Sequence, residues 1–448
     1  MVSSTVLRIS LPGLLLSSCV SRSPLRDPVI PEALDRIDVS PRDAGPRLLP
    51  RTAIDLSNGL SIDEATTIAV IANPGLRALR ANRGIAAAQV LEAGVLPNPE
   101  LDLGADVPTF GALAGTTTAA HVGISWEVTA LVTRDANVRA SEANAQKVDL
   151  EIAWQEWQQA MEARLEWRRL DASERELAAA QKSEADLKAI ADTLNAAASS
   201  GDATTVETSA ARSALDEAVL ARLAIEREHD RARRALARAL GVRLDAPFAL
   251  QAEAAAGTQE VPDHRALVDG LAAHRLDLLA LKLGYESQEQ RLRAAALSRF
   301  PRMTLGVAVA RDPTDVGTVG ASVAIALPVL DHAQGRVAVE SATRDQLREE
   351  YTAREYDARA DLDDAYAELA LAQAALASAE ATLPHLEQLV STYRAAFAQR
   401  LVDAPSVYVA VNSLDARRLD VLHRRLEIGD LITKIELASG QLVPGGTP

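Results

Sequence analysis

The chain has 448 residues, a net charge of −15, 48% apolar residues and only 3% aromatic residues. This acidic balance, without a basic stripe interleaved with aromatic residues, excludes a general nucleic-acid binder. A composition rich in Ala, Glu, Leu and Arg is typical of long helices that pack through small side chains. No run of about 18 apolar residues follows the N-terminal segment, so no transmembrane helix is expected.

Residues 1–18 have the features of a secretory signal peptide, with a basic residue, a short apolar run and small residues before Cys19. Cys19 is the only cysteine, so it cannot form an internal disulfide. The stretch from Leu16 to Cys19 resembles the bacterial lipobox, which implies a covalent lipid on Cys19. Val20, where aspartate would signal retention, implies the outer membrane. An ordinary signal peptide with an incidental cysteine is the alternative. Residues 19–59, rich in Pro and Arg, are predicted to be a lipid-anchored tether.

The first regular elements are a helix and two strands. Ser61 and Glu64 form a capping-box signature, and apolar residues at helical spacing follow it, interrupted by an Asn-Pro pair at 73–74. The stretches 97–108 and 121–128 then alternate apolar residues with period two. We expect a pair of strands of the length that crosses a membrane in a tilted barrel, about 9–11 residues each.

A long helical hairpin is expected next. Residues 124–200 contain neither Gly nor Pro, so most of them must be helical, and about 65 residues would span roughly 98 Å. After an interruption at 199–202, a second unbroken helical run extends from Thr205 to Leu240. The two runs predict an antiparallel hairpin, followed by a connector at 242–262.

The second half of the chain repeats the first. A shift of 202 residues aligns Leu103 with Leu305, and a shift of 199 aligns Gly241 with Gly440. Each copy is predicted to contain a short helix, two strands and a long helical hairpin. The predicted boundaries are 60–241 for the first repeat, 242–262 for the connector, 263–440 for the second repeat and 441–448 for a C-terminal tail.

The second copy is predicted to contain its own pair of strands and its own long helices. Residues 303–310 and 320–327 alternate around a turn that contains Asp, Pro and Gly. Residues 336–383 lack Gly and Pro, and Pro384 inside the expected helix predicts a kink.

The predicted fold class is α+β, mostly α, with four membrane-spanning β-strands per chain. Four strands cannot close a barrel with a lumen, and open sheet edges are not tolerated in lipid. Several chains must therefore share one barrel, and three chains would supply twelve strands.

The sequence lacks the motifs of common catalytic and metal sites. Seven histidines are scattered without an H-x-x-x-H pair, so a zinc site lacks its ligands. Neither a G-x-S-x-G elbow nor a phosphate-binding glycine loop occurs. Trp154, Trp157 and Trp167 fall on the first long helix, where packing is expected. We therefore expect no enzyme, no metal site and no cofactor other than the lipid on Cys19.

With its lipobox cysteine, the "PNPEL" stretch at 97–101 and its duplicated strand pairs and rods, the chain resembles the TolC-type outer-membrane efflux channels over residues 60–440. This resemblance implies a homotrimer with a twelve-stranded β-barrel in the outer membrane of a Gram-negative bacterium, continued by a twelve-helix periplasmic α-barrel. It implies passive export of metal ions or drugs, with a periplasmic adaptor and an inner-membrane pump as partners. The "PNPEL" form also looks like lipoproteins of heavy-metal efflux.

Two other classes of protein are alternatives to the channel. A periplasmic adaptor or scaffolding lipoprotein also uses long helical hairpins, but it would carry one hairpin flanked by β-rich modules. Here each of two hairpins follows a strand pair, which favours the channel. A cell-envelope hydrolase would need a catalytic constellation that the sequence lacks.

The family resemblance also implies functional residues at the helix–turn–helix tips, where such channels dock adaptors and form the periplasmic gate. The implied tip residues are Gly201, Asp202, Thr204 and Glu207 in the first repeat and Arg400, Asp403 and Ser406 in the second. The second tip departs from the family pattern at two positions. Arg400 stands where the family usually has Gly, and Ser406 stands where an acidic residue is common. Carboxylates of Glu207, Asp202 or Asp403 near a pore axis would attract cations, whereas solvated turn residues without that role are the alternative.

Overall fold

The structure is a computed structural model that describes residues 34, 54–111, 115–251, 261–399 and 401–443. The predicted signal peptide, Cys19, most of the predicted tether and Arg400 lie outside the described residues, as do parts of the predicted connector and tail.

Short helices, a strand pair and a long helical hairpin occur twice along the chain, in the order that the repeat predicts. The first set is η3 (Leu56–Asn58), α1 (Ile62–Ala72), α2 (Pro74–Arg80), α3 (Asn82–Gly94), β1 (Glu100–Asp106), β2 (Ala119–Glu127), α4 (Ala130–Ser199) and α5 (Thr205–Leu240). The second set is α6 (His264–His274), α7 (Leu276–Leu297), β3 (Met303–Arg311), β4 (Gly317–Ile325), α8 (Gln334–Ala398) and α9 (Ala404–Ser439).

The first helix begins and ends where its sequence signals lie. The Ser61 hydroxyl accepts from the Glu64 amide at 3.3 Å, and the Glu64 carboxylate accepts from the Ser61 amide at 2.9 Å. This capping box satisfies two amides that the helix itself cannot bond. Asn73 then ends α1 and caps α2, with Pro74 in the first turn, so the predicted break is confirmed.

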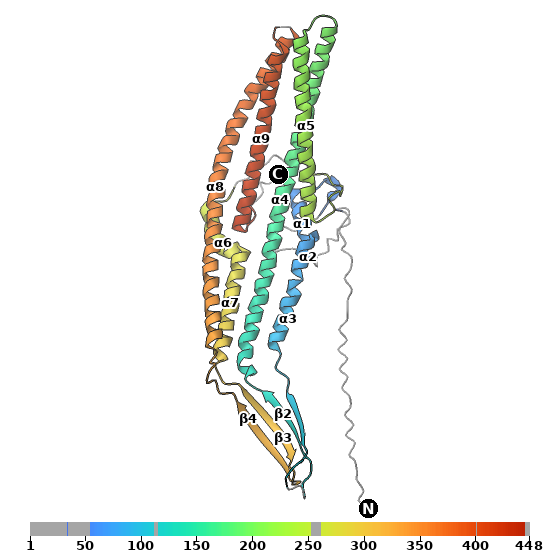
Figure 1. Ribbon diagram of the computed structural model, residues 1–448. Coiled ribbons are helices and arrows are strands. Elements are labelled where there is room, and N and C mark those ends of the chain that lie inside the picture. The colour runs from blue at the N-terminus through green and yellow to red at the C-terminus, as the bar shows by residue number, and fades with distance from the viewer. Residues whose placement is uncertain (1–33, 35–53, 112–114, 252–260, 400, 444–448) are drawn as a thin grey trace, which may run out of the picture.

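The molecule is elongated because α4 and α8 run almost its full helical length (Figure 1). With 70 residues, α4 is about 105 Å long. α5 and α9 flank these rods in the half away from the strands, and α3 and α7 flank them in the half near the strands. α8 continues through Pro384 and is curved in Figure 1.

The two repeats pack on each other through α4, which contacts α7 and α9. Trp157 and Trp167 of α4 are 0% and 2% exposed. Trp157 belongs to an apolar cluster against which Leu276 and Leu437 of the second repeat pack, whereas the Trp167 indole donates to the Leu60 carbonyl of its own repeat at 2.8 Å. The expected packing role of these side chains is confirmed. Across the same interface, Arg164 lies 3.4 Å from the buried Glu436 carboxylate, whose pKa is raised by burial.

The four strands form one antiparallel sheet in the order β1-β2-β3-β4, so β1 and β4 are its edges. All four strands were predicted, although β1 is shorter than the expected 97–108. Pro99 and Pro108 flank β1, and proline lacks the amide that a strand ladder requires.

Candidate functional site

The first helix–turn–helix tip is built around Gly201, which adopts a left-handed conformation with φ of 78°. The Gly201 amide donates to the Ala198 carbonyl at 3.0 Å, and the Asp202 amide donates to the Ala197 carbonyl at 2.8 Å. These two bonds form a Schellman motif, which satisfies the last carbonyls of α4. A residue with a Cβ is strained in this conformation, so glycine lets the chain reverse here.

Thr204 and Glu207 then start α5 as a capping box. The Thr204 amide donates to the Glu207 carboxylate at 2.7 Å, and the Glu207 amide donates to the Thr204 hydroxyl at 3.2 Å. The hydrogen bond from the Thr204 amide, followed by that from its hydroxyl, lowers the pKa of Glu207. Glu207 is therefore a negatively charged capping group at neutral pH.

In the second tip the two capping residues are exchanged. The Leu401 amide donates to the Ala396 carbonyl at 2.9 Å, at the spacing of the Schellman bond in the first tip. Asp403 starts α9, and its carboxylate accepts from the Ser406 amide at 3.2 Å and from the Ser406 hydroxyl. These bonds, the hydroxyl first, lower the pKa of Asp403. The acid thus precedes the hydroxyl here, whereas it follows the hydroxyl in the first tip.

The two tips lie at the same end of the molecule and are packed together (Figure 1). We call the shared apolar contact the tip cluster. Its buried members are Leu187, Ala191, Leu194, Ala211, Ala404 and Tyr408. The negative charge of Asp403 also acts on Glu207, where it opposes the lowering of the pKa. The structure therefore brings the predicted tip residues of the two repeats to the same end of the molecule, where Thr204 and Glu207 cap α5 and Asp403 and Ser406 cap α9.

Tyr408 was not identified from the sequence. It is 5% exposed, burial raises its pKa to about 12, and its hydroxyl has no hydrogen-bond partner among the described residues. The chain has only six tyrosines, so one placed in the first turns of a helix rich in Ala and Val was a usable signal.

The sheet at the other end has two chemically different faces. Cross-strand pairing places apolar side chains in rows, because paired residues and residues two apart share a face. The row through Leu101 continues with Ile124 and Val307. This apolar face comprises Leu101, Leu103, Val122, Ile124, Leu305, Val307, Val309, Val319, Val323 and Ile325, each between 45% and 77% exposed.

The opposite face carries polar and small residues. Asp102, Gly104, His121, Ser125, Glu127, Thr304, Thr318 and Ser322 lie on it. The His121 imidazole lies 2.9 Å from the Asp102 carboxylate. A Cβ on Gly104 would fall 2.1 Å from the His121 ring, so glycine makes room for it.

Within the described part of the chain, no helix is both long and apolar enough to cross a membrane. Among the same residues, no three His, Cys, Asp or Glu side chains gather as a metal site would require.

No family model matches the chain, and no curated protein matches its sequence. Solved structures do resemble it. The transmembrane channel CusC has a TM-score of 0.70 at 15% identity, covering 90% of this chain and 98% of that one. The outer-membrane channel OprN has a TM-score of 0.71 at 15% identity, covering 90% and 99%. The outer-membrane channel CmeC of Campylobacter jejuni has a TM-score of 0.69 at 11% identity, covering 94% and 93%.

These matches span nearly the whole of each compared protein and show that the chain has the same fold. The predicted resemblance to the TolC-type outer-membrane channels is therefore confirmed at the level of fold. The matched proteins named here are channels rather than enzymes.

Proposed function

We propose that the chain is one subunit of a trimeric outer-membrane channel of a tripartite efflux system, through which solutes leave passively. The observation that carries this proposal is the two-faced sheet. Ten apolar side chains on one face are 45–77% exposed, and burying such area in an apolar medium is favourable by about 25 cal/mol per Å². Lipid would cover this face, and the polar face of Asp102, His121 and Thr304 would line water.

Trimer formation would complete the sheet. β1 and β4 are edge strands within one chain, and their free backbone groups would be costly in lipid. Pairing β4 of one copy with β1 of the next removes both edges. Three copies would then close a twelve-stranded β-barrel, which the long helices would continue as a twelve-helix α-barrel through the periplasm.

The remaining assignments belong to the same proposal. Cys19 would carry a covalent lipid in the outer membrane of a Gram-negative bacterium. The tips around Gly201, Glu207 and Asp403 would form the gate and dock a periplasmic adaptor that links the channel to an inner-membrane pump. Metal ions and drugs are both compatible with this function. An adaptor function is not favoured, because a strand pair precedes each of the two hairpins.

The proposal is tested with the full-length protein purified in detergent. A channel subunit should have the mass of three chains by light scattering and should conduct ions after reconstitution into a planar lipid bilayer. A stable monomer that gives no conductance would overturn the proposal. Mass spectrometry of the N-terminal peptide tests the lipid separately, with Cys19→Ala as the control that cannot be acylated.

A further inference from the structure

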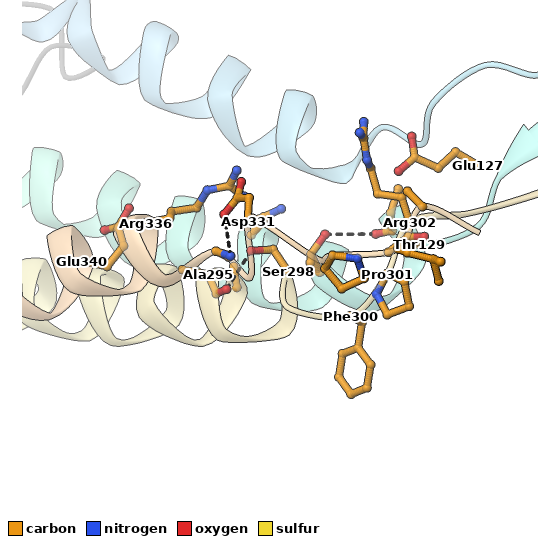
Figure 2. A pocket seen from close by; sticks show the side chains of 18 of the residues that line it. Glu127, Thr129, Ala295, Ser298, Phe300, Pro301, Arg302, Asp331, Arg336 and Glu340 are labelled. Carbon is orange, nitrogen blue, oxygen red and sulfur yellow. Dashed lines mark hydrogen bonds between the residues drawn. The ribbon is translucent and has the colours of Figure 1, made fainter. Parts of the chain in front are cut away.

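A cavity of about 980 Å³ lies where the sheet meets the helices (Figure 2). Its walls are the C-terminal end of α7, the N-terminal ends of α4 and α8, and the segments that join α7 to β3 and β4 to α8. All of these elements belong to one chain.

The strand register places part of the cavity wall in continuation of the polar face of the sheet. Glu127 pairs with Thr304, which pairs with Ala324 on the polar face. Two residues further on, Arg302 and Ala326 continue this pairing, since the Ala326 amide donates to the Arg302 carbonyl at 2.9 Å. Glu127, Arg302 and Ala326 all line the cavity, so residues that continue the polar face, which would line the channel, form part of its wall.

Three arginines of the cavity wall have unused hydrogen-bond donors. Arg291, Arg302 and Arg336 are exposed, and within the described part of the chain their side chains form no hydrogen bond or ion pair. Arg336 differs in this from the other arginines of α8, a helix that is described throughout. Those five donate to carboxylates: Arg344, Arg348, Arg354, Arg359 and Arg394.

Two of the three acids in the cavity wall already accept hydrogen bonds from the protein. Asp331 accepts from the Ala333 amide at 2.8 Å, and the Glu340 carboxylate accepts from the Gln288 amide group. Glu127 is the third acid. The charges of the wall balance, so what distinguishes the cavity is its three unfilled guanidinium groups. Guanidinium is the side chain best suited to bidentate binding of carboxylate and related oxyanions.

Apolar side chains adjoin these donors. Leu327, Val329 and Leu330 line the cavity and are 76%, 72% and 91% exposed. We propose that the cavity binds an amphipathic organic anion, with its carboxylate or sulfonate group on a guanidinium group of the wall, Arg302 or Arg336, and its apolar body on these three residues. This inference rests on the proposed channel function and adds to it a substrate class that passes along the polar face.

The test measures binding of 1-naphthalenesulfonate to the full-length protein in detergent by titration calorimetry. The double variant Arg302→Gln/Arg336→Gln should bind roughly tenfold or more weakly, because it removes the guanidinium groups that would donate charge-assisted hydrogen bonds to the anion. Arg293→Gln is the matched control, since Arg293 is an exposed arginine of α7 that does not line the cavity. Inorganic sulfate and tetraethylammonium should bind more weakly than the naphthalenesulfonate.

Equal binding by the wild type and the double variant, or tighter binding of tetraethylammonium, would overturn the inference. Should the double variant lose its oligomer, the single variants Arg302→Gln and Arg336→Gln provide the same comparison. Conductance of the same preparation separates the two proposals. A conducting protein that does not bind naphthalenesulfonate contradicts only the anion site, whereas a protein that never conducts contradicts the channel itself.

Discussion

The carboxylate of Asp186 on α4 lies 2.8 Å from the guanidinium group of Arg394 on α8. This ion pair joins the first hairpin to the second close to the tip cluster. It is the kind of contact that has to break if the two hairpins separate while each remains folded.

Asp186→Asn should therefore loosen the tips without unfolding the chain. Both partners are substantially exposed, so the free energy of unfolding should change by less than about 1 kcal/mol. Single-channel conductance or open probability in a planar bilayer should rise. Glu387→Gln is the matched control, because the 2.9 Å pair of Glu387 with Arg418 lies within the second hairpin. An equal rise in both variants would contradict a specific role for the pair between hairpins.

The capping carboxylates should make the tips sensitive to acid. The folded protein lowers the pKa of Glu207 and of Asp403 below their usual values of 4.5 and 3.8. Their charged forms therefore stabilise the caps above those values, and the stabilisation is lost as the pH falls through the lowered pKa values. Amide hydrogen-exchange protection of Thr204 and Ser406, corrected for intrinsic rates, should fall in that acidic range. In Glu207→Gln the acid-dependent step should disappear for Thr204 and persist for Ser406.

Two glycines that end helices should respond differently to alanine. Gly201 and Gly241 both have left-handed φ, but a Cβ at Gly201 meets open space, whereas at Gly241 it would lie 2.7 Å from Asn73 Cα. Gly201→Ala should cost about 1 kcal/mol of unfolding free energy from backbone strain alone. Gly241→Ala should cost about 3 kcal/mol, since overpacking against the backbone adds to the strain. Urea unfolding in detergent measures both, and equal losses would contradict the close approach of Gly241 to Asn73.

The two sheet faces predict opposite outcomes for neighbouring residues of β4. Val323→Arg places a charge on the apolar face and should oppose insertion by about 2–4 kcal/mol near the bilayer midplane. Ala324→Arg places it on the polar face, where water would solvate it. The folded fraction in lipid vesicles should drop for the first variant and stay near wild type for the second. A similar drop in both would show that the faces are not separated by lipid and water.

Local sequence patterns predicted the elements of this fold well. Period-two alternation indicated the strands, the absence of Gly and Pro from 124–200 indicated α4, and the glycines at 241 and 440 marked the repeat. These signals work because they reflect backbone preferences that act over a few residues.

The relationships between elements were not predictable in the same way. Asp186 and Arg394 are 208 residues apart, and neither stands out from the other charged residues around it. The sequence marks Tyr408 as one of six tyrosines, but the burial of its hydroxyl follows from the packing of the tip cluster. The cavity draws on the starts of α4 and α8 and the end of α7, so its arginines come together only through the fold.

The pairing of β2 with β3 joins two strands that are synthesised at different times. β2 ends at Glu127 and β3 begins at Met303, so a chain made from its N-terminus presents the β1–β2 hairpin long before its neighbour exists. At about 5–20 residues per second this interval lasts on the order of tens of seconds. An isolated two-stranded hairpin is marginally stable, so its apolar side chains need protection throughout that interval. The newly made chain should therefore depend on chaperones that bind its apolar side chains until the second repeat has been synthesised.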